Sequence, residues 1–251
     1  MNDVNIGPVK TSVLPERDGY HHGHLRNALI EAAARLVGDK GPEAFSLREA
    51  AREVGVSPAA AYRHFADKLA LMTAMSVEAH GRLAQAMERA LGRVEGKAGT
   101  RAHAVRSILA IAQAYVEFAV RNPSHFKVMF GACFSTEDFE PGCAPSGRDA
   151  FQILLDVLDG LVASGAIRPE ARLGAELVAW SGVHGLAGLL VSGALPLPPR
   201  ARQAATLTVA RTQLLGMGVA PELLPAVEPI SVDPRVLHER EAAAGLARRR
   251  A

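Results

Sequence analysis

Several side chains in the first third of the chain have types suited to holding a polyanion. Ser46 and Ser57 each stand where a helix could begin, so the backbone N–H groups beside them can face an anion. Tyr62, His64 and Lys68 add hydroxyl, imidazole and ammonium donors. Donors of these kinds contact nucleic-acid phosphates, where they position a protein but carry little sequence information.

Recognition of bases would fall to other residues. Arg48 could reach a phosphate or a base edge, whereas Ala59 and Ala60 offer only contact with thymine methyl groups and close approach of the backbone. We therefore expect Arg48, an N-terminal arm carrying Arg17 and residues 20–24, and DNA shape to share the readout.

Two short helices with a tight turn between them would position these groups. Ser46 and Glu49 form a capping box, which predicts a helix beginning near Leu47. Its apolar residues recur with helical periodicity, and Gly55 follows directly after them, where glycine adopts a left-handed turn at little cost. The members of the apolar stripe are Leu47, Ala50, Ala51 and Val54.

The second helix of this pair is predicted from about Pro58 to His64. Ser57 is its N-cap, and Pro58 at the first helical position loses no hydrogen bond. Asp67 can cap the helix that follows. An ordinary helical hairpin would have the same spacing, with Tyr62 in its core and the histidines at 21, 22 and 24 merely solvated.

The segment from Leu25 to Met75 resembles the DNA-binding domain of TetR-family transcription regulators. The resemblance rests on AAARLVGDKG in the first helix, the turn EVGVS and the sequence AYRHFADKLAL. It implies an all-α homodimer, in which three N-terminal helices bind DNA and a larger C-terminal helical domain dimerises and binds a small ligand. Ala61 departs from the family pattern, which commonly has a large aliphatic residue before the Tyr, so a neighbour must fill the core there.

Composition excludes several classes of protein but does not reveal nucleic-acid binding. The chain has 251 residues, 49% of them hydrophobic, and a formal net charge of +2. From Arg17 to Lys68 we count eight Lys or Arg against seven Asp or Glu, so binding must depend on the placement of a few groups. The sequence shows neither a signal peptide nor an apolar run long enough for a membrane span, and we expect a cytoplasmic protein without a cofactor.

Turn formers divide the chain into a flexible arm (1–24), the helix-turn-helix domain (25–66), a helical ligand-binding and dimerisation domain (67–216) and a tail that is partly disordered or a short helix (217–251). No convincing strand pattern occurs. Besides the pair described above, the predicted helices span residues 25–40, 67–94, 101–121, a short segment after Pro123, 148–164, 169–192 and 200–215.

A second resemblance concerns the C-terminal domain. Trp180, His184 and Gly185, in WSGVHGLAGLL, are similar to the Trp-His-Gly signature of one TetR branch, and NPSHFKVMFG resembles a segment of the same domain. Trp180 and His184 are four residues apart and so share a helix face. An apolar effector pocket is one interpretation of this region, and plain core packing is the other. The candidate ligand-binding residues are Phe118, Phe126, Met129, Phe130, Trp180 and His184.

The last two long helices have more apolar surface than a single neighbour needs, which favours dimerisation over a closed monomeric core. TetR-like proteins pair these helices with the mate in a four-helix bundle. A two-fold dimer would place its recognition helices roughly 34 to 36 Å apart, or farther on a longer site, and bind a pseudo-palindromic operator. The candidate interface residues are Leu173, Leu177, Leu189, Leu207, Arg211 and Leu214.

The resulting prediction is a regulator, most simply a repressor, that a small molecule releases from DNA. One alternative is a metal- or redox-responsive regulator using Cys133 and Cys143, although these lack the CxxC spacing of a metal site. A remote alternative is an all-helical enzyme using His184, His125 and the cysteines. We expect no catalytic residues and no metal site.

Overall fold

The computed structural model describes residues 22–130 and 141–230, and within these ranges the chain is helical without strands. The all-α prediction is confirmed. The helices are α1 (His22–Lys40), α2 (Leu47–Val54), α3 (Pro58–Tyr62), α4 (Lys68–Leu91), α5 (Arg101–Arg121), α6 (Pro123–Met129), α7 (Ala150–Ala163), α8 (Ala175–Val191) and α9 (Pro199–Gly216), with short 3-10 turns η2 (Pro169–Arg172) and η3 (Pro221–Leu223).

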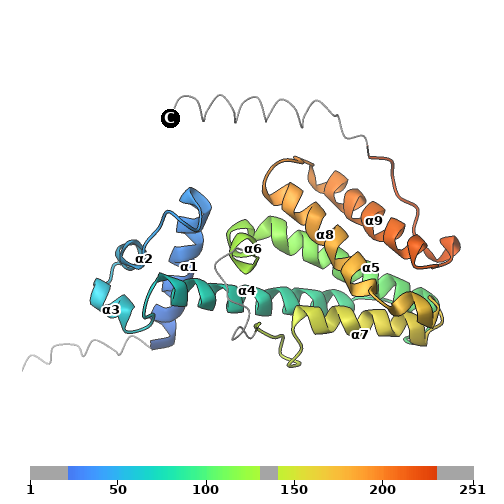
Figure 1. Cartoon of the computed structure of the whole chain (residues 1–251), viewed down its shortest axis with the longest axis horizontal. Helices are drawn as coiled ribbons and strands as arrows, with labels where there is room; N and C mark the ends of the chain where they lie inside the picture. Colours follow the sequence, from blue (N-terminus) through green and yellow to red (C-terminus); the bar gives the residue numbers. More distant parts are fainter. Residues whose placement is uncertain (1–21, 131–140, 231–251) are drawn as a thin grey trace, which may run out of the picture.

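The helices form two bodies that share α4. Helices α1 to α3 gather at one end of the molecule, and α5, α7, α8 and α9 stack at the other (Figure 1). Helix α4 has 24 residues, a length of about 36 Å, and runs from one body along the other. Among the described helices, none has the length and apolarity needed to span a membrane.

The local signals of the helix pair are confirmed. Ser46 and Glu49 form the capping box at the start of α2, and Ser57 accepts from the N–H of Ala60 at 3.2 Å to cap α3. Gly55 ends α2 with φ of 79°, while Asp67 caps α4 by accepting from Ala70 N–H at 2.7 Å. Each cap satisfies a backbone N–H that the first turn of a helix leaves unpaired, so the chain turns at positions fixed by side-chain chemistry.

Each body has its own hydrophobic core. The N-terminal core includes the first two turns of α4, from Leu71 to Met75, so the boundary between the bodies lies inside α4 and not at residue 66. Ala61 is fully buried in this core together with Phe45 and Phe65. Val128 of α6 belongs to the same core, although its neighbours Phe126 and Met129 pack in the C-terminal one. Helix α6 therefore contacts both bodies.

The structure corrects three predicted boundaries. Helix α1 begins at His22, so the last residues assigned to the arm are its first turn; residues 1–21, with Arg17 and Tyr20, lie outside the described residues. The predicted helix 169–192 is broken, because Gly174 adopts φ of 73° between η2 and α8. The tail does not begin at residue 217: Val219 and Leu224 are buried in the C-terminal core, and residues 231–251 lie outside the described part.

We predict that Gly55→Ala lowers the free energy of unfolding by about 1 kcal/mol, because an L side chain is strained at positive φ. A Cβ at Gly55 would meet no atom within 4 Å, so the loss would come from the backbone alone. Gly160, inside α7 and equally uncrowded, is the matched control, and Gly160→Ala should stabilise by roughly 0.5–1 kcal/mol. Urea denaturation measures the free energy of unfolding of both variants. Equal changes of the same sign in the two variants would contradict the prediction.

Candidate DNA interface and effector cavity

The predicted DNA-contacting side chains occupy one end of the N-terminal body. Arg48, Ala59 and Tyr62 are exposed, and Tyr62 retains 46% of its accessible surface, so it is not a core residue. Ser57 and Pro58 are exposed at the start of α3. The structure thus brings the N-terminal turns of α2 and α3 and the hydroxyl of Tyr62 to an accessible surface.

Three of the candidates are more constrained than the sequence suggested. Ala60 is buried, with 8% of its surface accessible, so the expectation that it is exposed beside Ala59 is wrong: it faces the core of the helix pair. The Ser46 hydroxyl donates to Glu49 Oε2 at 3.2 Å and accepts from Glu49 N–H at 3.3 Å. Its hydroxyl hydrogen is therefore used within the capping box. His64 is half-buried beyond the end of α3.

Lys68 is held against the loop between α1 and α2. Its Nζ donates to the carbonyl oxygen of Glu43 at 2.9 Å and lies 4.8 Å from the centre of the Phe45 ring. An ammonium group has three donors, so this anchoring leaves donors for a phosphate at a fixed height. Anchoring also ties the start of α4 to the loop before α2.

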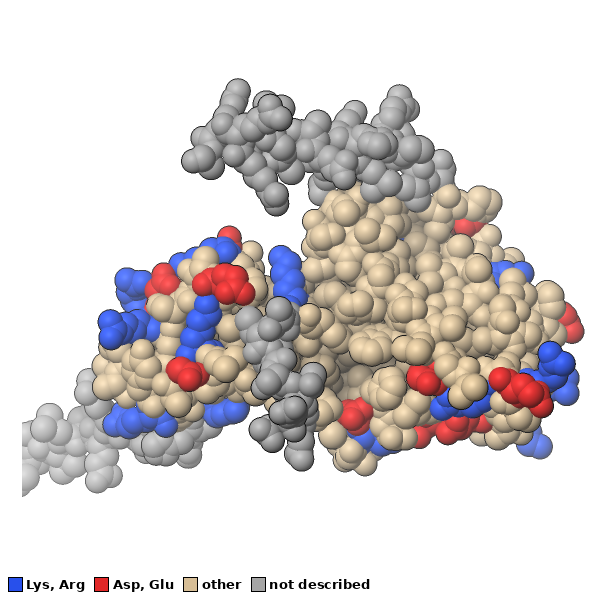
Figure 2. Space-filling model, viewed as in Figure 1, with Lys and Arg blue, Asp and Glu red and all other residues tan. Residues whose placement is uncertain are grey.

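Charges on this body are partly neutralised. Lys40 lies 2.7 Å from Glu49 and lowers the pKa of that carboxyl group, and Arg35 pairs with Glu53. Figure 2 shows Lys and Arg side chains gathered over the N-terminal body with acidic side chains between them. Arg48 is exposed and takes part in no ion pair with another described residue. It is therefore the cation on α2 with the greatest freedom to reach DNA.

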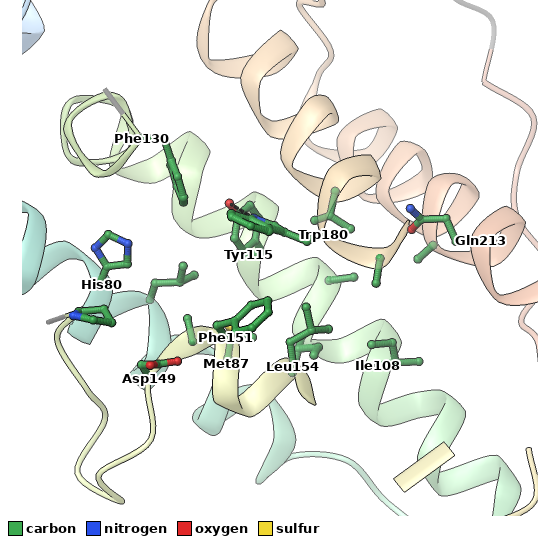
Figure 3. Close-up of a pocket in the computed structure, with 18 of the residues that line it drawn as sticks. His80, Met87, Ile108, Tyr115, Phe130, Asp149, Phe151, Leu154, Trp180 and Gln213 are labelled. Carbon is green, nitrogen blue, oxygen red and sulfur yellow. Dashed lines mark hydrogen bonds between the residues drawn. The ribbon is translucent and has the colours of Figure 1, made fainter. Parts of the chain in front are cut away.

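The C-terminal body contains a partly open apolar cavity of about 310 Å³. Helices α4, α5, α7, α8 and α9 supply its walls, and Figure 3 shows His80 and Gln213 on opposite sides with aromatic rings between them. A cavity of this volume lies at the lower end of the range for small-molecule sites. The wall includes His80, Tyr115, Asp149, Phe151, Trp180 and Gln213.

Tyr115 connects the two residues of the Trp-His-Gly signature. Its hydroxyl accepts from Trp180 Nε1 at 3.3 Å and lies 2.8 Å from His184 Nδ1. The indole N–H can only donate, so the Tyr115 oxygen is its acceptor, and the tautomer of His184 decides whether the Tyr115 hydroxyl donates to Nδ1 or accepts from it. Burial lowers the pKa of His184 and raises that of Tyr115, which is consistent with a neutral, internally satisfied trio.

Only part of the predicted ligand-binding set faces this cavity. Phe130 and Trp180 line it, while His184 stands behind them with its ring centre 4.5 Å from that of Phe130. Phe118, Phe126 and Met129 are buried in the C-terminal core and are not among the wall residues, so for them the packing interpretation holds.

Sequence reasoning missed most of the wall, because its residues come from five helices. Tyr115 and Phe151 carry the clearest signal, since each is an aromatic residue on the apolar face of a helix that was correctly predicted.

The candidate dimer residues divide into exposed and buried ones. Leu173, Leu177 and Leu189 retain 95%, 67% and 47% of their accessible surface, as expected for an unpaired apolar face. Figure 2 shows a largely uncharged surface over the middle of the C-terminal body, with a few charged side chains near its edge. Leu214 is only 2% exposed and lines the cavity, so the prediction that it lies at an interface is wrong.

The remaining two candidates on α9 are half-buried. Leu207 packs against the C-terminal core. Arg211 donates to the carbonyl oxygen of Pro225 at 3.0 Å, which attaches the segment after α9 to this helix.

A charged cluster lies where the two bodies meet. Arg82 of α4 bridges Glu31 of α1 and Glu78 of its own helix. His125 of α6 is 6% exposed, and its buried Nε2 has no hydrogen-bond partner among the described residues. Burial, and secondly the positive charge of Arg82, lower the pKa of His125. The junction therefore favours the neutral form of His125.

Groups suited to metal binding are not assembled in the described ranges. No group of three or more His, Cys, Asp or Glu side chains that could hold a metal ion is present in residues 22–130 and 141–230. Cys143 is an exposed free thiol, whereas Cys133 lies outside the described residues. His125 lies in the junction cluster, and His184 is bound to Tyr115.

Two family models match the chain. Residues 29–75 match the model described as bacterial regulatory proteins of the tetR family. Residues 108–212 match a tetracyclin repressor-like C-terminal domain, a range that contains Trp180, His184 and Gly185. Both resemblances drawn from the sequence are thereby supported independently.

Solved structures have the same architecture. A protein of unknown function from Rhodococcus sp. RHA1 is 31% identical, with a TM-score of 0.62, over 80% of this chain and 98% of its own. A tetR-family regulatory protein from Rhodococcus RHA1 is 19% identical, with a TM-score of 0.58, over 78% and 98%. A complex of SmeT with triclosan is 16% identical, with a TM-score of 0.54, over 84% and 99%.

We expect Lys68→Ala to weaken DNA binding by a similar factor on every sequence and to lower the slope of log affinity against log salt by about one, because one phosphate contact disappears. Fluorescence anisotropy with labelled duplexes across a salt series measures both. Lys97→Ala, in the exposed loop between α4 and α5, is the matched control and should leave the slope unaltered. An unaltered slope for Lys68→Ala would restrict Lys68 to anchoring the loop.

The buried histidines predict a pH dependence of stability. Burial lowers the pKa of His80, His125 and His184. As the pH falls through the unfolded value of about 6.5, the unfolded chain binds protons that the folded chain rejects, so the free energy of unfolding must fall, by up to about 1.4 kcal/mol per pH unit for each histidine. Urea denaturation between about pH 7.5 and 5.5 should show this, with a smaller slope in His125→Gln. A flat profile would contradict it.

Proposed function

The chain belongs to the TetR family of bacterial transcription regulators, and from that membership we propose that it is a repressor which binds a pseudo-palindromic operator as a homodimer and releases it when a small molecule occupies the C-terminal cavity. One observation carries the proposal: a single continuous helix, α4, joins the helix-turn-helix body to the wall of an apolar cavity.

DNA binding would use the N-terminal body as a clamp on the phosphate backbone and α3 as the helix in the major groove. Tyr62 and Lys68 are suited to phosphate contact, while Ala59 approaches the bases closely and Arg48 offers the hydrogen-bonding side chain of α2. Ser57 and Pro58 shape the start of the recognition helix. Because the reading edge is small and apolar, DNA shape should contribute to specificity.

The proposed dimer would bury the exposed face of α8 and α9. Leu177, Val178 and Leu189 on α8, and Leu215 on α9, retain between 39% and 67% of their surface. Apolar surface of this extent is typical of a protein-protein interface when it is contiguous. A two-fold axis through this face would place the two α3 helices on one side of a DNA duplex.

The effector would act by changing the spacing of those helices. Helix α6 supports this proposal, because Val128 packs in the N-terminal core while Phe130, directly after the helix, lines the cavity. A ligand that shifts Phe130 would therefore displace the N-terminal body through α6 as well as through α4. Couplings of this kind are typically about 1 to 3 kcal/mol.

Binding rather than catalysis is the proposed activity. The cavity of SmeT-like folds offers an analogy, since SmeT has been solved with triclosan. For this chain, the proposal of ligand binding rests on the cavity itself, whose wall residues are predominantly apolar. We place the protein in the cytoplasm, where an operator is accessible to it.

The first experiment is selection of binding sites from fragmented genomic DNA with the purified protein. We predict enrichment of a pseudo-palindrome whose half-sites lie at least about one helical turn apart. Sites without internal symmetry would contradict the proposed dimer, and absence of enrichment would contradict specific DNA binding.

The dimer is tested by Leu177→Asp. A charge in the proposed interface should yield a monomer in sedimentation velocity and lower operator affinity by at least about a hundredfold, because each half-site then binds alone. Leu69→Asp is the matched control: Leu69 is 51% exposed but lies on α4 in the N-terminal region, so this variant should remain dimeric. A dimeric Leu177→Asp protein would place the interface elsewhere.

A further inference from the structure

Several N–H donors at the cavity are bonded to partners within the protein. His80 Nδ1 donates to the carbonyl oxygen of Ser76 at 2.8 Å, and Gln213 Nε2 donates to that of Val178. The Trp180 N–H donates to the Tyr115 oxygen, which also shares a hydrogen bond with His184 Nδ1. The N–H groups of His80 and Trp180 could serve a ligand only by giving up these partners, which costs free energy.

The charges at the cavity also disfavour an anion. None of the described wall residues is Lys or Arg, and the one carboxylate among them is Asp149. Burial lowers the pKa of His80, so this imidazole is not a cation at neutral pH. A carboxylate or phosphate placed here would lose its hydration without gaining a positive partner.

One helix terminus at the cavity could in principle attract an anion, and it is occupied. Helix α7 begins at Ala150, beside the cavity, and helix N-termini favour negative charge. Asp149 Oδ1 accepts from Gln152 N–H at 2.7 Å and so places the protein's own carboxylate at that terminus. A second anion would be repelled by it.

We infer that the cavity selects an uncharged, hydrophobic, ring-containing molecule and rejects carboxylates of the same shape. The aromatic walls favour rings: Phe151 and Phe130 lie with ring centres 6.0 and 6.1 Å from that of Trp180. That such a ligand regulates DNA binding rests on the proposed function. Which ligands bind depends only on the cavity.

Three probes of one shape and different charge test the inference: 1-adamantanemethanol, 1-adamantanecarboxylate and 1-adamantanemethylammonium. Trp180 is the single tryptophan of the chain and lines the cavity, so its fluorescence reports occupancy there directly. At neutral pH the alcohol should bind at least about tenfold more tightly than the carboxylate. Carboxylate affinity should fall about tenfold per pH unit above the probe's own pKa, because only the neutral acid enters.

A charge-gain variant provides the matched comparison. Phe151 is 46% exposed at the cavity wall, so a polar side chain can replace it without being buried. Phe151→Lys should raise carboxylate affinity at least about tenfold relative to Phe151→Gln, because only the lysine supplies an opposite charge. Equal carboxylate affinity of these two variants would overturn the inference.

The remaining outcomes are equally decisive. Carboxylate binding as tight as alcohol binding would overturn the inference, because a donor now bonded within the protein would then have to bind the carboxylate. Tighter binding of the ammonium probe would assign the cavity to cations, and failure of all three probes to bind would deny a hydrophobic site. Operator binding, measured without any probe, separates these results from a failure of the proposed function: a protein that binds DNA but not the alcohol contradicts only the ligand class.

Discussion

Packing of α4 in two hydrophobic cores at once is the constraint on which the rest of the structure depends. Leu71 and Met75 belong to the core of the helix-turn-helix body, while Leu83 and Met87 belong to the C-terminal core and line the cavity. Because close-packed cores resist continuous deformation, a displacement of one end of the helix must be matched at the other. Regulation then requires no contact between ligand and DNA.

The junction between the bodies adds a second connection at α6. Val128 lies in one core and Phe126 in the other, and the neighbouring His125 faces the Arg82 cluster. Arg82 pairs with Glu31 of α1, so charge as well as packing holds the N-terminal body in register with α4. His125 Nε2 has no hydrogen-bond partner among the described residues, so protonation would place a buried charge at the junction, which is costly.

The sequence predicted the DNA-binding end of the molecule in detail, because its determinants are local. Ser46, Gly55, Ser57 and Asp67 each act on backbone groups within a few residues, and all four do so as expected. Ala60 was misjudged because the side of a five-residue helix that faces the core is fixed by neighbouring helices and not by its own periodicity.

The effector cavity could not be predicted to the same degree. Packing of five helices brings its wall residues together. Residues far apart in the sequence are in contact there, as Tyr115 and Trp180 are. Aromatic residues near the signature were visible in the sequence, but which of them face a cavity depends on helix rotation. Phe130 does, whereas Phe126, four residues earlier, packs in the core.

The measurement that tests the central claim most directly is thermodynamic linkage between operator and cavity. Operator affinity is measured with and without saturating 1-adamantanemethanol, and probe affinity, from Trp180 fluorescence, with and without saturating operator. If α4 and α6 couple the sites, both affinities should fall by the same factor, between about 5-fold and 150-fold. Two affinities that are each indifferent to the other ligand would contradict the account.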